Sequence, residues 1–243
     1  MPKLVDEIIE AYHDHIGKEP KEYKTPGFPN QTLKKWDGNP VDPTAYRKIV
    51  GKDMYLVTKM LPEGGNSARE LTKHFSNPGP DHWKSVGRMV GHLKKNKNKL
   101  KLTYRKPKEL RATNSSDSDY ASAEDRRSVS GNIGTLGGCI TDWQSSTQQT
   151  VSLSSAEAEY YSAAKGAQGI IFKNNLLTEL FGKAVTPGML IEDNEGCIFM
   201  VKNQSTSART KHIDIRAHFM REHYMKGSFD IIKTDTLEQK RML

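Results

Sequence analysis

The stretch "TVSLSSAEAEYYSAA", residues 150–164, decides the fold of the second half of the chain because it begins a long helix. Ser154 or Ser155 is the expected N-cap, since a serine oxygen accepts a hydrogen bond from a free N–H of the first turn. Small and apolar residues predominate as far as Gly182, a residue that commonly ends helices. The pattern therefore predicts a helix over roughly 155–181.

Two glutamates, Glu157 and Glu159, lie in the first turns of this predicted helix. A buried glutamate is costly unless it is paired, hydrogen-bonded or bound to a metal. Positions two apart on a helix differ by about 200° in direction, so both side chains cannot face one site equally. Both flank the same apolar stripe, and the helical period therefore does not decide between them.

Segments on either side of this helix predict the other elements of an α/β domain. Residues 99–104, "KLKLTY", alternate polar and apolar as a half-exposed strand does. The stretches 109–121 and 128–143 are rich in Gly, Ser and Thr and predict strands joined by hairpin turns. After the helix we expect a buried strand at 188–193, helices at 195–203 and 215–227, and a last strand at 228–234. The order β-β-β-α-β-α-α-β implies a mixed sheet flanked by helices.

The first part of the chain has a different pattern. Apolar residues recur with a helical period over 4–16, and Gly17 ends this segment. Further helical patterns follow a proline-rich connector and continue to residue 96. We therefore expect a mostly helical segment at 1–98 and an α/β domain at 99–243.

Composition narrows the classes of function. The chain has 243 residues, a net charge of +8 and a pI near 9.3, which favours a polyanionic partner, nucleic acid before an anionic membrane. Cys139 and Cys197 form neither a disulfide framework nor a metal-ligand spacing, which is typical of a reducing compartment. No apolar run approaches the ~18 residues of a membrane span, and the start lacks a signal-peptide pattern. We expect an intracellular protein, in the cytoplasm or the nucleus, that does not enter a membrane.

Acidic residues lie where the predicted strands end and the long helix begins. Asp117 and Asp119 lie in one predicted strand, and Asp193 ends another. Acids at such positions can converge on one crevice of an α/β sheet, and without a Cys or His cluster they favour Mg²⁺ or Mn²⁺. Two such ions roughly 3.5–4 Å apart can support cleavage of a phosphodiester. Each acid also has a simpler role open to it, as a turn residue, a helix cap or a partner of the helix dipole.

Three stretches, taken together, are more specific. They are "SDSDYASAEDRRSVSGNIGTLGGCITDWQSSTQQTVSLSSAEAEYYSAA" (116–164), "IEDNEGCIFMVKN" (191–203) and "ARTKHIDIRAHFMREHYMKG" (208–227). In this order they resemble the C-terminal RNase H domain of Ty1/copia-type retrotransposon Pol polyproteins. The resemblance implies an RNase H-like, five-stranded mixed sheet flanked by helices. It also implies metal-dependent hydrolysis of the RNA strand of an RNA–DNA hybrid.

The resemblance assigns the catalytic acids to positions of this chain. Asp117 leads "DSDYA", Glu159 is the second acid of "AEAEY", and Asp193 is the aspartate of "EDN". It implies that these three residues ligate two Mg²⁺ or Mn²⁺ ions and that a metal-bound water attacks the RNA phosphate. Glu157 is left as a solvent-facing residue or a partner of the helix dipole.

Residues 46–95, "YRKIVGKDMYLV…VGHLKK", resemble the segment that joins reverse transcriptase to RNase H in the same elements. An upstream reverse transcriptase domain of the same polyprotein is therefore an expected partner. The chain holds no tyrosine-x-Asp-Asp polymerase motif, and we do not expect it to polymerise DNA by itself.

The chain departs from the family pattern near its last residue. The family has a fourth acid soon after a segment like "TLEQ", which stands here at 236–239 and is followed by "KRML". Arg241 occupies the place expected for that acid, so either the acid is lost or the end of the sequence is truncated or diverged. A positive charge at that place would repel a second cation. The alternative function is therefore a non-catalytic module of the same origin that binds nucleic acid or protein.

Basic residues gather in two other places. Residues 84–111 hold eleven lysines or arginines against one acid, Glu109, which predicts either a grip on phosphates or a solvated surface run. Arg209 and Lys211 are candidate contacts to the hybrid backbone, and His212 is a candidate for proton transfer.

Overall fold

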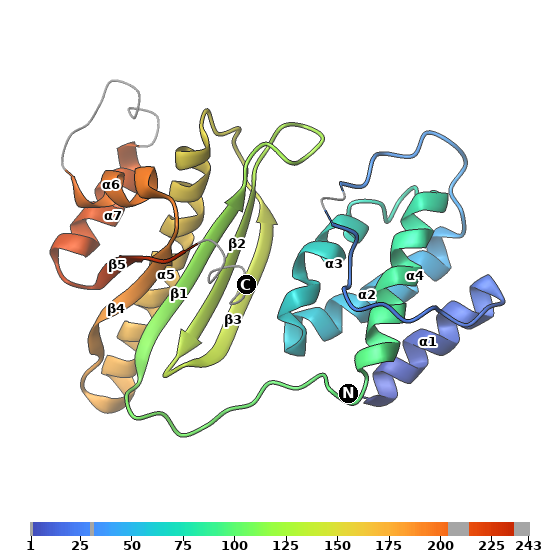
Figure 1. The fold of residues 1–243 in the computed structure, drawn as a ribbon, viewed down its shortest axis with the longest axis horizontal. Coiled ribbons are helices and arrows are strands. Elements are labelled where there is room, and N and C mark those ends of the chain that lie inside the picture. The colour runs from blue at the N-terminus through green and yellow to red at the C-terminus, as the bar shows by residue number, and fades with distance from the viewer. Residues whose placement is uncertain (1, 30–31, 204–213, 236–243) are drawn as a thin grey trace. The chain divides into compact units, whose positions relative to one another are not determined.

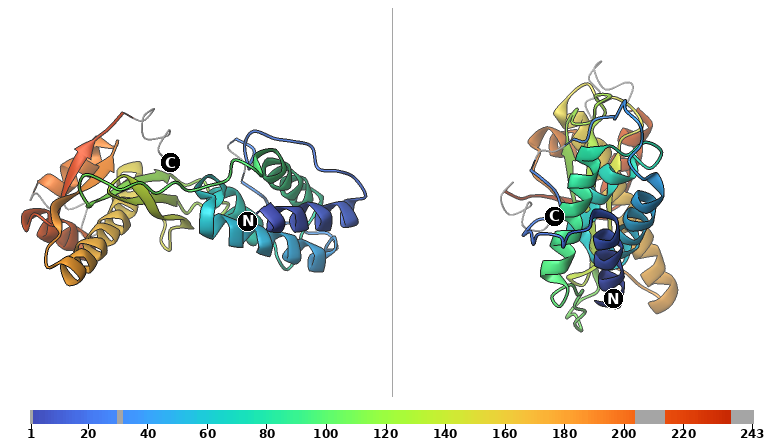
Figure 2. Two further views of the ribbon diagram at one scale, coloured as in Figure 1. Left: turned by 90° about the horizontal axis from the view of Figure 1, so that it is seen from below. Right: turned by 90° about the vertical axis from the view of Figure 1, so that its right-hand side faces the viewer.

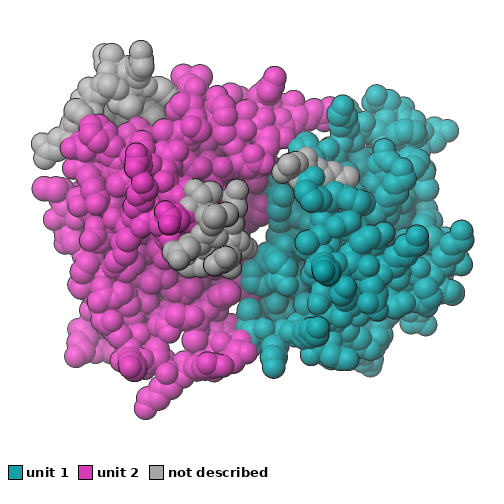
Figure 3. Space-filling model, viewed as in Figure 1, with its two compact units in different colours: residues 1–102 teal, residues 103–243 magenta. Residues whose placement is uncertain are grey.

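The computed structural model describes residues 2–29, 32–203 and 214–235. The chain divides into two compact units, residues 1–102 and 103–243, which are coloured separately in Figure 3. The boundary predicted after residue 98 lies close to this division. That each unit is a separate domain stays a prediction.

Unit 1 is helical in the residues that the structure describes (Figure 1). Its elements are α1 (Pro2–Ile16), α2 (Pro43–Met60), a 3₁₀ turn (Pro62–Gly64), α3 (Gly65–Thr72) and α4 (Pro80–Asn96). Local signals set the ends of these helices: Asp42 accepts a hydrogen bond from the N–H of Ala45 at 2.9 Å, and Gly17 has a φ of 71°. The helices enclose an apolar core that includes the fully buried side chains of Ile8, Tyr46, Leu56, Met89 and Leu93.

The described part of unit 2 contains one five-stranded sheet and three helices. The strands are β1 (Arg111–Asp119), β2 (Val129–Leu136), β3 (Cys139–Thr147), β4 (Val185–Glu192) and β5 (Phe229–Lys233). The helices are α5 (Ser155–Phe181), α6 (Glu195–Lys202) and α7 (Asp214–Met225). In space the strands follow the order β3-β2-β1-β4-β5; β1 pairs antiparallel with β2 and parallel with β4. The predicted class, a mixed five-stranded sheet flanked by helices and preceded by a helical segment, is confirmed.

The long helix α5 lies along one face of this sheet, behind β1 in Figure 1 and again against the strands in the turned view of Figure 2. Its buried residues join Ala112 of β1, Leu190 of β4 and Phe229 of β5 in one apolar core, to which α6 and α7 also contribute. Close packing depends on small residues: a Cβ at Gly166 would lie 2.5 Å from Oδ1 of Asn114 and 2.9 Å from Cδ1 of Leu190. Among the helices in the described parts of both units, none combines the length and the apolar character needed to cross a membrane.

The strand predicted at 99–104 is wrong. Residues 100–107 have no regular secondary structure and connect the two units. Leu100 packs against the core of unit 1, and the N–H of Arg105 donates to Sγ of Cys139 at 3.4 Å. The alternation of Lys and Leu therefore reflects a stretch with partly buried leucines and exposed lysines, without a neighbouring strand to complete a ladder.

Candidate metal centre

The pairing of two parallel strands brings Asp117 and Asp193 to the same level of the sheet. Ser115 of β1 lies opposite Ile191 of β4, and each aspartate follows two residues later. Asp117 is still within β1, whereas Asp193 is the first residue after β4. Acids at the carboxyl ends of neighbouring parallel strands point into a common crevice, where α/β proteins usually bind ligands.

The third acid comes from the first turns of α5. The hydroxyl of Ser154 accepts a hydrogen bond from the N–H of Glu157 at 3.1 Å, which fixes the start of the helix as predicted. Glu159 follows in the same part of α5, where the helix packs on β1 and β2 and Ser162 donates to the carbonyl of Asp117 at 2.9 Å. This hydrogen bond holds the start of α5 directly over the strand that carries Asp117.

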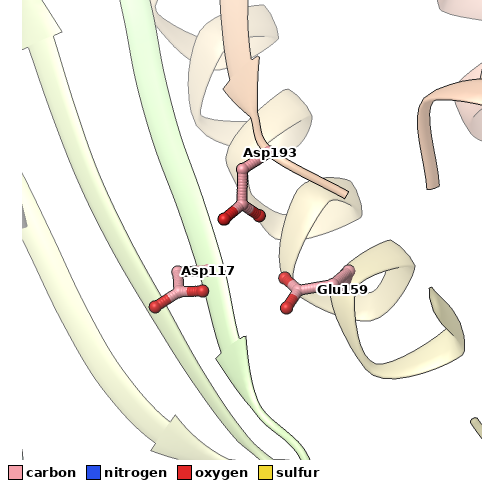
Figure 4. Close-up of side chains that lie close together, drawn as sticks. All are labelled: Asp117, Glu159 and Asp193. Atoms are coloured by element: carbon pink, nitrogen blue, oxygen red, sulfur yellow. The ribbon is translucent and has the colours of Figure 1, made fainter. Parts of the chain in front are cut away.

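The three carboxyl groups converge, as Figure 4 shows. Asp117, Glu159 and Asp193 each offer one oxygen, and these oxygens all lie within 4.8 Å of one another. Glu159 is buried, with 7% of its surface exposed, and the two aspartates are partly buried. The structure therefore brings together all three acids that the resemblance implied.

Electrostatics at Glu159 favour a bound cation. Burial, followed by the negative charges of Glu192 and Asp117, raises the pKa of Glu159 to about 9. Its Oε2 atom is buried and has no hydrogen-bond partner among the described residues. An unpaired buried carboxylate oxygen that faces other acids is costly, and a hard cation would remove that cost.

Glu157 does not face solvent, so the first of its two predicted roles is wrong, whereas its place in the first turn of α5 agrees with the second, a partner of the helix dipole. Only 4% of its surface is exposed, and its Oε2 accepts a hydrogen bond from the N–H of Leu153 at 2.7 Å. Together with the Ser154 cap, this hydrogen bond satisfies two otherwise free N–H groups at the start of the helix, those of Leu153 and Glu157. Glu157 therefore stabilises the start of α5 and lies outside the carboxylate cluster.

A further acid, Glu192, was missed from the sequence. It is the last residue of β4 and has no exposed surface. Burial raises its pKa to about 8, and the charges of Asp193 and Asp117 add to this shift. The strand period offered a signal, because Glu192 shares a face with the core residue Leu190, two positions earlier.

The remaining candidates lie apart from this cluster. Asp119 is exposed at the end of β1. In the basic run, Lys94 pairs with Glu19 at 2.7 Å and Lys97 pairs with Asp6, whereas the lysines of the connector are exposed. The proposed nucleic-acid contacts and the residue at the place of the fourth acid lie outside the described residues: Arg209, Lys211, His212 and Arg241.

The fold is that of an α/β protein with a mixed five-stranded sheet. Three acids, from β1, from the residue after β4 and from α5, form a candidate centre for a divalent cation. Comparison with known proteins gives the family. The chain is 30% identical over 194 residues, 79% of its length, to the retrovirus-related Pol polyprotein from transposon TNT 1-94 of Nicotiana tabacum. It is 31% identical over 221 residues, 90% of its length, to the corresponding polyprotein from transposon RE1 of Arabidopsis thaliana. The chain is therefore a homologue of retrovirus-related Pol polyproteins of transposons, of the Ty1/copia type that its motifs resemble.

The chain spans only a small part of these relatives, 14% of the first polyprotein and 15% of the second. It covers far more of a third relative, the secreted RxLR effector protein 161 of Plasmopara viticola, with 31% identity over 128 residues, 52% of this chain and 89% of that protein. No protein-family model matches the chain. Among solved structures, LC11-RNase H1 from compost aligns with a TM-score of 0.42 and 10% identity, over 54% of this chain and 89% of that one. A likeness this distant does not bear on the activity.

Proposed function

We propose that unit 2 hydrolyses the RNA strand of RNA–DNA hybrids with the help of divalent cations held by Asp117, Glu159 and Asp193. The observation that carries this proposal is the convergence of the three carboxylates within 4.8 Å. Homology to transposon Pol polyproteins supports it, because the motifs that carry these three acids resemble the RNase H domain of such polyproteins.

The residues present fit Mg²⁺ or Mn²⁺. All three side chains offer oxygen ligands, which these hard cations prefer, and Oε2 of Glu159 lacks any other partner among the described residues. When bound, a pair of such ions supplies Lewis-acid activation of water and stabilisation of charge on the phosphate. The contribution of the chain is to hold Asp117 and Asp193 by strand pairing and Glu159 by the capped helix, so that the ligands are oriented before the substrate arrives.

The substrate proposal also draws on charge. A net charge of +8 favours a polyanion, and the connector between the units adds exposed lysines that are available to phosphates. In the longer polyproteins of this family, we propose that an upstream reverse transcriptase supplies the hybrid. The helical unit 1 would then be the segment between the polymerase and unit 2.

A second candidate function, a non-catalytic binding module, is favoured by a different observation. The chain covers 89% of a relative that is named an effector protein rather than a polyprotein. Arg241 at the place of the fourth acid would also suit a fold that binds without cleaving.

One assay tests both candidates. Purified protein is incubated with a hybrid labelled on its RNA strand, in Mg²⁺, in Mn²⁺ or in EDTA, and with single-stranded RNA and duplex DNA as other substrates. We expect cleavage of the RNA in the hybrid alone, lost in EDTA and in Asp117→Asn or Glu159→Gln. Asp119→Asn is the matched control, because this exposed acid lies two residues from Asp117 and outside the cluster. An intact hybrid that nevertheless binds the protein would reject the enzyme in favour of the second candidate.

A further inference from the structure

Glu192 is a completely buried acid with two hydrogen bonds that the chemistry above does not use. Its Oε2 accepts from the hydroxyl of Ser116 at 2.9 Å, and its Oε1 accepts from the N–H of Asn194 at 3.2 Å. One carboxyl group therefore connects β1 to the turn between β4 and α6.

Each of these hydrogen bonds adjoins a member of the carboxylate cluster. Ser116 immediately precedes Asp117, and Asn194 immediately follows Asp193. Asn194 is also the N-cap of α6, where its Oδ1 accepts from the N–H of Cys197 at 3.0 Å. A shift of the Glu192 carboxyl would thus move both aspartate backbones and the start of α6 together.

A role in folding alone is a poor explanation for an acid at this position. Burying a carboxyl costs free energy that an apolar side chain of similar size would not, even when hydrogen bonds compensate in part. Leu190, on the same face of β4 two residues earlier, shows the kind of side chain that this core otherwise takes. Groups that orient metal ligands, by contrast, are typically polar and hydrogen-bonded.

We propose that Glu192 is a positioning residue, whose carboxyl braces β1 against the β4–α6 turn and so holds Asp117 and Asp193 at the spacing required by a divalent cation. This inference rests on the proposed function, because it assumes that the three acids bind such a cation. Glu192 itself does not contact the cation or the substrate in this role.

The test is Mn²⁺ binding by isothermal titration calorimetry, with thermal unfolding recorded for every protein. Glu192→Leu removes both hydrogen bonds, and we expect its Kd for Mn²⁺ to rise about 10–100-fold, as for other groups that orient metal ligands. Glu192→Gln can still accept from Asn194 and can donate to Ser116, so it should bind Mn²⁺ within about threefold of the wild type. Asn174→Leu is the matched control: this buried polar residue lies far along α5 and bonds to the carbonyl of Ser228.

The outcomes separate the two proposals. Wild-type protein that binds no Mn²⁺ would overturn the proposed metal centre and the brace with it. Wild-type affinity in Glu192→Leu would overturn the brace alone. Equal losses in the Gln and Leu variants would also overturn it, because they would assign the effect to the charge of Glu192. A loss in Glu192→Leu with rescue in Glu192→Gln, without a fall in the melting temperature, supports positioning.

Discussion

Glu157 and Glu159 lie two residues apart on α5, yet their carboxylates have opposite surroundings. Oε2 of Glu157 accepts a hydrogen bond from the N–H of Leu153 at 2.7 Å, whereas Oε2 of Glu159 is buried without a hydrogen-bond partner among the described residues. The first acid is satisfied by the chain itself, whereas this oxygen of the second has no partner in the described part of the chain. This difference separates a structural role from a chemical one.

Substituting these two glutamates should therefore have opposite effects. Glu159→Gln removes a buried ionisable group, so we expect unchanged or higher stability together with loss of Mn²⁺ binding and of hybrid cleavage. Glu157→Ala leaves the N–H of Leu153 without its acceptor at the start of α5 and should lower the free energy of unfolding by about 1 kcal/mol, while cleavage is retained. Urea unfolding and the hybrid assay measure the two effects. Cleavage by Glu159→Gln, or loss of Mn²⁺ binding in a folded Glu157→Ala protein, would contradict the assignment.

Asp53 in unit 1 provides a test of stability against pH. It has no exposed surface, neither of its carboxylate oxygens has a hydrogen-bond partner among the described residues, and burial raises its pKa well above 3.8. A raised folded-state pKa gives stability that is fully present below the unfolded pKa of 3.8 and is lost as pH rises towards the folded pKa. Asp53→Asn should therefore gain about 1–3 kcal/mol at pH 7 and little at pH 3.5.

Urea unfolding at pH 3.5, 5 and 7 measures this difference. Asp37→Asn is the matched control, since it removes an exposed aspartate of the same unit. A gain for Asp53→Asn that is equal at all three pH values would show that the Asp53 carboxyl has an ordinary pKa.

Local signals explain what the sequence predicted well, and non-local pairing explains what it did not. The bounds of α5 follow from Ser154 and Gly182, which act within one turn of the helix. Ser154 and Glu157 also have the local S-x-x-E spacing of a helix start, so a role for Glu157 at the first turn of α5 was present in the sequence. The error at 99–104 arose because an alternating pattern cannot reveal whether a neighbouring strand exists.

The candidate site depended on more than local pattern. Helix geometry left Glu157 and Glu159 equivalent, and only the family resemblance selected Glu159. The convergence of Asp117 with Asp193 depends on the register of β1 and β4, two strands separated by more than 60 residues of chain. The interaction of Glu192 was missed because it also depends on the pairing of β1 with β4: its partner Ser116 lies on β1.

The exposed lysines in and beside the connector at residues 100–107 should contribute salt-dependent affinity for the hybrid. The variant replaces four exposed lysines by glutamine: Lys99, Lys101, Lys106 and Lys108. If each contacts a phosphate, the slope of log K against log salt should fall by about 0.7–0.9 per lysine removed. The control replaces four exposed lysines of unit 1 that lie far from the connector in the sequence: Lys18, Lys24, Lys48 and Lys59. Fluorescence anisotropy at several salt concentrations gives both slopes, and equal slopes for the two variants would show that the connector is only a solvated surface.

Arg241 should limit the activity of the centre if it stands where the family has its fourth acid. The residue lies outside the described residues, and its position follows from its place after "TLEQ" in the sequence. An acid there would add a ligand, whereas a guanidinium repels a cation, so Arg241→Asp should raise the rate of hybrid cleavage in Mg²⁺ by roughly tenfold or more, equivalent to ~1.4 kcal/mol in the barrier. Arg241→Asn removes the positive charge without adding a ligand and separates the two effects. If both variants are faster than the wild type by the same factor, repulsion by Arg241 alone limits the enzyme. If both have the wild-type rate, residue 241 has no part in the centre.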